Sequence, residues 1–148
     1  MSLVERIRAA GSYSEALDLT ISHFAADSGT IHMLESDGAL HLKAASRGLP
    51  EAVLKIVQRV PVGKGMAGLA VERAEPVGAC NIQTDTSGDV RPGAKATGME
   101  GALVVPIFDG AKAVGALGIA NRAERTFSSE ETALLIEAGR MIASASYA

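Results

Sequence analysis

Two apolar runs joined by a turn decide the fold of this chain: Ala102-Leu-Val-Val-Pro-Ile-Phe108, then Asp109-Gly110, then Ala113-Val-Gly-Ala-Leu-Gly-Ile119. Runs of this length around an Asp-Gly pair predict a β-hairpin. Both alternating sets of residues are apolar, so neither face of the hairpin suits water. The sequence therefore predicts a sheet that is covered on both sides.

The pairing of these two strands assigns each side chain to a face, because successive residues of a strand point to opposite sides. A loop of two or four residues places Leu103, Val105, Ile107, Val114, Ala116 and Gly118 on one face. The other face then carries Ala102, Val104, Pro106, Ala113, Gly115, Leu117 and Ile119. Small residues such as Ala116 and Gly118 leave room above the first face.

Further strands and helices follow from local signals. Two alternating runs between Gly29 and Ala45 flank Ser36-Asp37-Gly38 and predict a second hairpin, and residues 76–82 predict a short strand. Residues 51–58 and 64–72 predict short helices. Serine three residues before glutamate, the spacing of a capping box, predicts three helix starts: Ser2 with Glu5, Ser12 with Glu15, and Ser128 with Glu131. The fold class is α+β, with an antiparallel sheet of about five or six strands.

The last helix is apolar over most of its circumference. Its polar residues form one narrow stripe, Glu130, Glu137, Arg140 and Ser144. One sheet face cannot bury an apolar arc that wide, so a second partner is expected. We expect a homodimer in which terminal helices pack together; the alternative is that the short first helix covers the excess.

Composition excludes several classes of protein. The chain has 148 residues, 47% of them apolar, which suits a single domain spanning residues 1–148. A net charge of -3 without a basic block, and an aromatic content of 3%, argue against nucleic acid as a partner. No apolar run has membrane-spanning length, no signal peptide is evident, and the single cysteine, Cys80, cannot form an internal disulfide. A cytoplasmic location without a membrane role is expected.

Four motifs in order resemble one family: Pro61-Val-Gly-Lys-Gly-Met-Ala-Gly68, Leu103-Val-Val-Pro-Ile107, Val114-Gly-Ala-Leu-Gly-Ile119 and Phe127-Ser-Ser-Glu-Glu131. They resemble the GAF domain, a module that binds small molecules in signalling proteins, over a core of about residues 12–145. The resemblance implies a profilin-like and PAS-related fold, with terminal helices on one face of the sheet and a pocket-forming segment on the other. A PAS domain is the main alternative fold.

Several motifs suggest chemistry that their surroundings do not support. Gly63-x-Gly65-x-x-Gly68 matches a dinucleotide fingerprint, but it lacks the βαβ context, so a tight start to a helix is the better interpretation, with amides that could meet an anionic group. His32 and His41 share one face if the hairpin turn has two residues; a solvated or lightly buried face is expected rather than a metal site. Asn121-Arg122 with Phe127 and Glu130-Glu131 resembles the signature of cyclic-nucleotide-binding GAF domains, with arginine for lysine and one residue fewer before the acidic pair.

Cys80 has no base or cation beside it in sequence, so we expect a buried, inert thiol. The GAF fold also includes free methionine sulfoxide reductases, whose activity depends on several cysteines. This chain has one, so we expect no enzymatic activity, no catalytic residues and no cofactor.

The polar stretch from Gln83 to Gly101 is the candidate ligand site, because long loops in compact domains are often functional. Folded over the small residues of the sheet, it would roof an apolar cavity with a few polar groups. Arg91 is the expected anchor for an anionic group; the alternative is that Arg91 pairs with Asp85 or Asp89 and only pins the loop. The predicted ligand-binding residues are Cys80, Asp85, Val90, Arg91, Thr97, Met99, Val105, Ala116 and Gly118.

These observations predict a sensor that binds an unidentified small molecule and acts through dimer helices on a separate signalling protein. The ligand would favour one closure of the Gln83 to Gly101 loop and so bias the packing of the helices. Two alternatives stay open: a pocketless module for dimerisation or protein docking, and a thiol-dependent reductase on the same fold.

Overall fold

The computed structural model describes residues 1–90, 95, 97–145 and 147, and it has the predicted α+β class. Six strands form one antiparallel sheet in the order β3-β2-β1-β6-β5-β4. The strands are β1 Ser28–Leu34, β2 Ala39–Ala45, β3 Arg59–Pro61, β4 Val77–Ala79, β5 Gly101–Asp109 and β6 Lys112–Asn121. The described helices are α1 Leu3–Ala9, α2 Tyr13–His23, α3 Glu51–Val57, α4 Gly65–Arg73 and α6 Ser129–Ala145. The three-residue strand β3 was not predicted.

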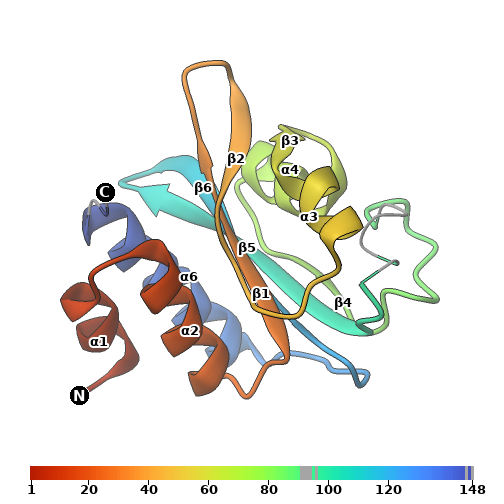
Figure 1. Cartoon of the computed structure of the whole chain (residues 1–148), viewed down its shortest axis with the longest axis horizontal. Coiled ribbons are helices and arrows are strands. Elements are labelled where there is room, and N and C mark those ends of the chain that lie inside the picture. The colour runs from red at the N-terminus through yellow and green to blue at the C-terminus, as the bar shows by residue number, and fades with distance from the viewer. Residues whose placement is uncertain (91–94, 96, 146, 148) are drawn as a thin grey trace.

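Helices cover both sides of the sheet. Figure 1 shows α1, α2 and α6 together on one side and α3 and α4 on the other. We call the first side the helix face and the second the pocket face. Two separate apolar clusters result, one beneath the terminal helices and a smaller one between the sheet and α4. None of the helices in the described part of the chain is long and apolar enough to cross a membrane.

The three serine caps form as predicted. The hydroxyls of Ser2, Ser12 and Ser128 accept from the amides of Glu5, Glu15 and Glu131 at 3.2, 3.1 and 3.0 Å. At α6 the contact is reciprocal, because a Glu131 carboxylate oxygen accepts from the Ser128 amide at 2.9 Å. That amide, followed by the Arg125 guanidinium, lowers the pKa of Glu131. Each helix start is thus fixed by a contact local in sequence.

The predicted register of the β5–β6 hairpin is wrong by one residue. Near the turn, Asp109 lies opposite Lys112. If the strands continued from there without interruption, Val105 would lie opposite Ala116, as predicted. A β-bulge between Ile107 and Phe108 then places an extra residue, Val114, in β6, so that Val105 lies opposite Leu117. One extra residue moves every later side chain to the other face. As a result Val105 lies on the helix face, while Ala116 and Gly118 lie on the pocket face.

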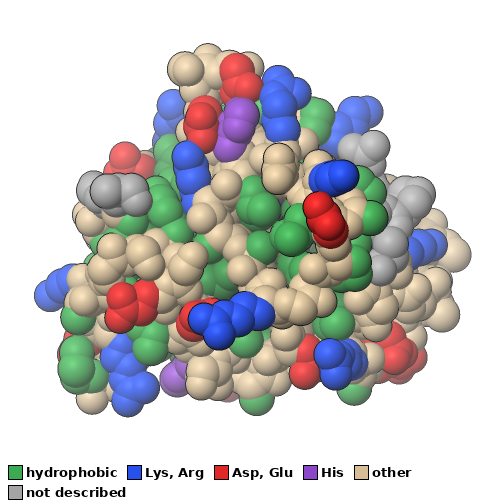
Figure 2. All heavy atoms as spheres, in the orientation of Figure 1, with side chains coloured by type: hydrophobic (Ala, Val, Ile, Leu, Met, Phe, Trp, Pro, Cys, Tyr) green, Lys and Arg blue, Asp and Glu red, His purple; other side chains and the backbone are tan. Residues whose placement is uncertain are grey.

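The β1–β2 hairpin departs from prediction for a related reason. Its loop has three residues, closed by a bond from the Glu35 amide to the Ala39 carbonyl, with Gly38 at φ +82°. Met33 therefore lies opposite His41, and His32 opposite Leu42. The two-residue turn on which a shared face depended does not form, and the two histidines lie on opposite faces. His41 joins Asp37 and Arg59 in the charged group that Figure 2 shows at the hairpin tip.

The helix face is tightly packed. Ile31, Leu117 and Val105 are fully buried beneath Leu17 of α2 and Leu135 of α6. The short helix α1 covers the outer apolar side of α6 with Leu3 and Ile7, and the Tyr147 hydroxyl donates to the Ile7 carbonyl. The apolar arc of the last helix is thus covered in part within one chain: Leu135, Ala138 and Ile142 are buried, whereas Ala133 is exposed and Met141 is half-buried. Homodimerisation itself stays a prediction.

Candidate functional site

A cavity of about 420 Å³ lies between the pocket face and its cover. Its floor is built from strands β1, β5 and β6, with small or short side chains: Thr30, His32, Ala102, Val104, Gly118 and Ala120. Its roof comes from α3, α4 and the segment after β4: Val53, Ile56, Val57, Met66, Ile82 and Met99. Ligand sites typically have such a volume and such an apolar lining with few polar groups.

The glycine at position 118 is one reason that the cavity is open. A Cβ atom there would lie 3.2 Å from Val104 Cγ2 and 3.6 Å from Thr30 Oγ1, so any larger side chain would enter the space above the sheet. Gly29 differs, because a Cβ there would lie 2.7 Å from the Gly118 carbonyl oxygen. Gly29 is required by close backbone packing, whereas Gly118 keeps volume free.

His32 is the most informative polar residue of the cavity. Its side chain is buried, with 2% of the residue exposed, and its Nε2 lies 2.7 Å from the Val57 carbonyl oxygen. Its Nδ1 is buried and has no hydrogen-bond partner among the residues that the structure describes. Burial lowers the pKa of His32, against the opposing effect of the bond to Val57. The prediction of a solvated or lightly buried His32 is thus wrong: the imidazole is a neutral, buried group whose second nitrogen is unsatisfied.

The charged residues described around the cavity are all basic. Arg59 and Lys64 line it, and none of the described residues that line it is acidic. The Arg59 guanidinium already donates to the Asp37 carboxylate at 3.1 Å, whereas the Lys64 ammonium forms no ion pair with a described residue. Gly65, Met66 and Ala67, the first residues of α4, also line the cavity. The amides of a first helical turn have no intrahelical acceptor and favour negative charge.

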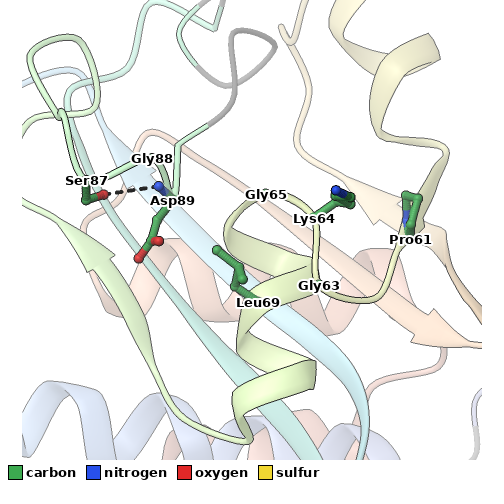
Figure 3. Close-up of a pocket in the computed structure, with 8 residues that line it drawn as sticks. All are labelled: Pro61, Gly63, Lys64, Gly65, Leu69, Ser87, Gly88 and Asp89. Atoms are coloured by element: carbon green, nitrogen blue, oxygen red, sulfur yellow. Dashed lines mark hydrogen bonds between the residues drawn. The ribbon is translucent and has the colours of Figure 1, made fainter.

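A second hollow, of about 560 Å³, lies on the other side of Lys64 (Figure 3). The turn from Gly63 to Gly65 faces the segment from Ser87 to Asp89 across it. Two polar groups here already have partners: Asp89 accepts two hydrogen bonds from Arg73 at 3.0 and 3.2 Å, and Ser87 Oγ accepts from the Asp89 amide. The cavity above the sheet is the stronger ligand site, because its lining is mostly apolar and comes from both the sheet and the helices that cover it.

Three of the nine predicted site residues line the cavity: Thr97, Met99 and Gly118. Ala116 lies on the same sheet face, opposite His32 and Pro106, but is buried outside the cavity. Val90 packs against the apolar cluster beneath α4. Val105 lies on the opposite face of the sheet because of the bulge described above.

The remaining predicted residues lie elsewhere. Cys80 is exposed, so the prediction of a buried thiol is wrong. Asp85 accepts from the amide and hydroxyl of Ser87 at 2.9 and 2.5 Å and does not line the cavity. Arg91 lies outside the described residues; Asp89, one of its predicted alternative partners, accepts from Arg73.

Sequence reasoning missed the contribution of α3 and of His32. Val53 and Val57 are visible in the sequence as apolar residues of a short helix, but nothing local indicates which surface they cover. His32 lies between Ile31 and Met33 in an otherwise apolar strand. A histidine within such a run was the one sequence signal that its side chain is buried.

Two motifs have structural roles. The glycines at 63, 65 and 68 form the turn into α4, with Gly63 and Gly65 at positive φ and a Cβ at Gly68 excluded by the Pro61 carbonyl at 2.4 Å. The segment with the cyclic-nucleotide signature lies outside the cavity. There Arg125 donates to the Phe24 carbonyl and to Glu131, both at 2.7 Å, and lies over the Phe127 ring. This cluster ties the start of α6 to the end of α2.

The family model described as the GAF domain matches residues 12–145, which is most of the chain. The chain belongs to the GAF domain family. Among proteins with curated descriptions, none matches this GAF domain.

Solved structures share the fold. The GAF domain of an Acinetobacter phosphoenolpyruvate-protein phosphotransferase is 20% identical with a TM-score of 0.78, and the alignment covers 97% of this chain and 87% of that one. The corresponding GAF domain from Coxiella burnetii is 27% identical, with a TM-score of 0.73 and coverage of 97% and 89%. A free methionine-R-sulfoxide reductase from Thermoplasma acidophilum is 20% identical, with a TM-score of 0.74 and coverage of 97% and 94%. GAF domains of two phosphotransferases and a free methionine-R-sulfoxide reductase thus share this architecture.

Proposed function

We propose that this GAF domain is a sensor whose small-molecule ligand binds in the cavity on the pocket face. The observation that carries the proposal is the cavity itself, which has a volume of about 420 Å³ and a mostly apolar lining. Gly118 contributes to keeping this space free of side chains. Small-molecule sites typically combine such a volume with an apolar lining and few polar groups.

The signal would cross the sheet to the terminal helices. Thr30 and Gly118 face the cavity, and their chain neighbours Ile31 and Leu117 are buried beneath α2 and α6. A ligand that favours one position of these strands would favour one packing of the helices, which is a population shift. The output would pass to a separate signalling protein in the cytoplasm, with a homodimer as the transmitting unit. Because α1 and α2 already cover part of the apolar side of α6, such a dimer would use the remaining apolar residues together with polar surface.

A sensor is favoured over the two alternatives. A thiol-dependent reductase needs reactive cysteines at its site, whereas the one cysteine of this chain is exposed and does not line the cavity. A pocketless docking module needs the pocket face to be filled, and a cavity of about 420 Å³ argues against that.

Native mass spectrometry of the freshly purified protein tests this proposal. We expect an extra small mass that is lost on denaturation, on a species of twice the chain mass if the homodimer forms. The variant Ala120→Leu, which places a larger side chain in the cavity, should lose the extra mass. Ala52→Leu, on an exposed position of α3 outside the cavity, is the matched control.

A protein that carries no extra mass can be screened against a fragment library by ligand-observed NMR. If no fragment binds in a manner sensitive to Ala120→Leu, the docking module becomes the better account. Light scattering at micromolar concentration decides the homodimer separately, because a monomer there would exclude it.

A further inference from the structure

The floor of the cavity contains a hydroxyl group in a row of three residues across the sheet. Thr30 of β1 lies opposite Gly118 of β6, and Gly118 lies opposite Val104 of β5. All three line the cavity. A Cβ at Gly118 would lie 3.6 Å from Thr30 Oγ1 and 3.2 Å from Val104 Cγ2. The Thr30 hydroxyl therefore borders the space that Gly118 leaves open.

This hydroxyl is available to a ligand. Thr30 is partly exposed, and its side chain forms no hydrogen bond with any residue that the structure describes. Thr20 differs, because its buried hydroxyl donates to the Ala16 carbonyl at 2.8 Å, a local bond that a helix offers and a strand does not. A hydroxyl can both donate and accept, so Thr30 suits a neutral hydroxyl or carbonyl group of a ligand.

The charged residues that line the cavity do not provide a buried partner for an ion. None of the described lining residues is acidic, so a cation would have no counter-ion. The two basic lining residues, Arg59 and Lys64, are both exposed, and solvent screens their charges. Arg59 also donates to Asp37 already. An ionised group beside Thr30 would thus lose its hydration without compensation.

No aromatic ring contributes to the cavity. The chain has three phenylalanines, two tyrosines and no tryptophan, and none of these five rings is among the lining residues. A planar base or similar ring system, which proteins commonly hold by stacking, has no platform here. The roof instead presents aliphatic side chains and the thioethers of Met66 and Met99. Methionine adapts to irregular apolar shapes, which suits a saturated body.

From these contacts we infer that the ligand is an uncharged, mainly aliphatic molecule with one neutral hydroxyl or carbonyl group, and that Thr30 binds this group. The aliphatic body lies over Gly118 and Val104, beneath the two methionines. This inference rests on the proposed function. It specifies the chemical class of the ligand and assigns Thr30 as a residue that determines specificity.

Adamantane derivatives of similar size test this class on the unaltered protein by isothermal titration calorimetry. Adamantanol carries a rigid saturated body and one hydroxyl, and is expected to bind. Adamantanecarboxylate and adamantylamine replace the hydroxyl by an anion and a cation. Each should bind more weakly by about tenfold or more, because an ionised group loses hydration in the cavity without a buried partner.

Variants at Thr30 assign the polar contact. Thr30→Val replaces the hydroxyl by a methyl group and should weaken adamantanol about threefold to tenfold, the effect of one net hydrogen bond. Fluoroadamantane, followed by fluorine NMR, lacks the hydroxyl and should bind both proteins equally. Thr30→Ser keeps the hydroxyl and should restore most of the affinity for adamantanol. Thr126→Val, at an exposed position outside the cavity, is the matched control and should change neither affinity. Circular dichroism checks that each variant is folded.

The outcomes separate this inference from the proposed function. If the carboxylate or the amine binds as tightly as adamantanol, the inferred class is wrong although the cavity binds small molecules. If Thr30→Val leaves adamantanol unchanged, or weakens fluoroadamantane to the same extent, Thr30 does not bind the polar group. If none of the four probes binds, the inference fails, and the mass spectrum and the fragment screen alone decide the proposed function.

Discussion

Strands β1, β6 and β5 present two surfaces that differ in side-chain size and in cover. On the helix face, Ile31, Val105 and Leu117 are large and fully buried beneath α2 and α6. On the pocket face, the adjacent positions carry Thr30, Gly118 and other small residues beneath thinner cover, and a cavity remains. The comparison shows that the same strands can contribute most of their packing energy on one face and leave space for a ligand on the other.

Truncation of a large side chain should reveal the largest difference in unfolding free energy between the two faces. Leu117→Ala removes a fully buried side chain on the helix face and should cost about 2 to 5 kcal/mol of unfolding free energy, since the space left is only partly refilled. Val104→Ala, on the pocket face beside the cavity, should cost about 1 kcal/mol, because fewer contacts are lost. Urea denaturation measures both, and equal losses would contradict the distinction between the faces.

Two glycines allow the opposite test, in which a methyl group is added. Gly29→Ala places a Cβ 2.7 Å from a backbone oxygen and 3.1 Å from Leu17, so it should destabilise the protein by about 1 to 3 kcal/mol. Gly118→Ala meets side-chain atoms at 3.2 Å or more and gains from a less flexible unfolded chain. It should be neutral or slightly stabilising in thermal unfolding while it weakens ligand binding. A strongly destabilised Gly118→Ala protein would mean that the pocket face is as tightly packed as the other.

The cap of α6 provides a smaller effect confined to the helix face. Ser128→Ala removes the hydroxyl that accepts from the Glu131 amide and should cost about 1 kcal/mol. Ser129→Ala, one residue later and exposed, serves as the control. Ligand affinity should be the same in both variants, measured with whichever probe the unaltered protein binds.

The smallest expected effect is a pH dependence that arises from the pocket face. Burial lowers the pKa of His32 below its ordinary 6.5, so the unfolded chain binds a proton at a pH where the folded protein does not. Stability is therefore full above about pH 6.5 and falls with acidification, by at most about 0.7 kcal/mol between about pH 7 and about pH 6. His32→Gln, which cannot titrate, should lose this part of the dependence. If the variant shows the same dependence of unfolding free energy on pH, that dependence comes from other titratable groups.

The elements of the fold could be predicted because their signals are local. The serine caps and the periodic apolar residues lie within a few positions of the contacts that they form, as Ser128 and Glu131 illustrate. The face on which each strand residue lies could not be predicted, because it depends on β-bulges and on the length of the hairpin loop. Neither the extra residue Val114 nor the three-residue loop before Ala39 changes the apolar pattern, yet each reverses the side on which later residues lie.

The candidate site was predicted only in part for the same reason. Thr97, Met99 and Gly118 line the cavity, whereas Val105 was assigned to the wrong face. The roof from α3 and the burial of His32 depend on tertiary packing, and Val57 meets His32 from 25 residues away. No short window of sequence contains both partners of that contact.

The packing of α1 against the end of α6 has a practical consequence for protein engineering. The hydrogen bond between Tyr147 and Ile7 and the edge-on contact of Tyr13 with Tyr147 hold both described ends on the helix face. Figure 1 shows both ends on the side of the sheet away from α3 and α4. A fluorescent protein fused to either end should leave the cavity clear and lie beside the helices whose packing the proposed signal would change, so the domain offers a scaffold for a genetically encoded biosensor.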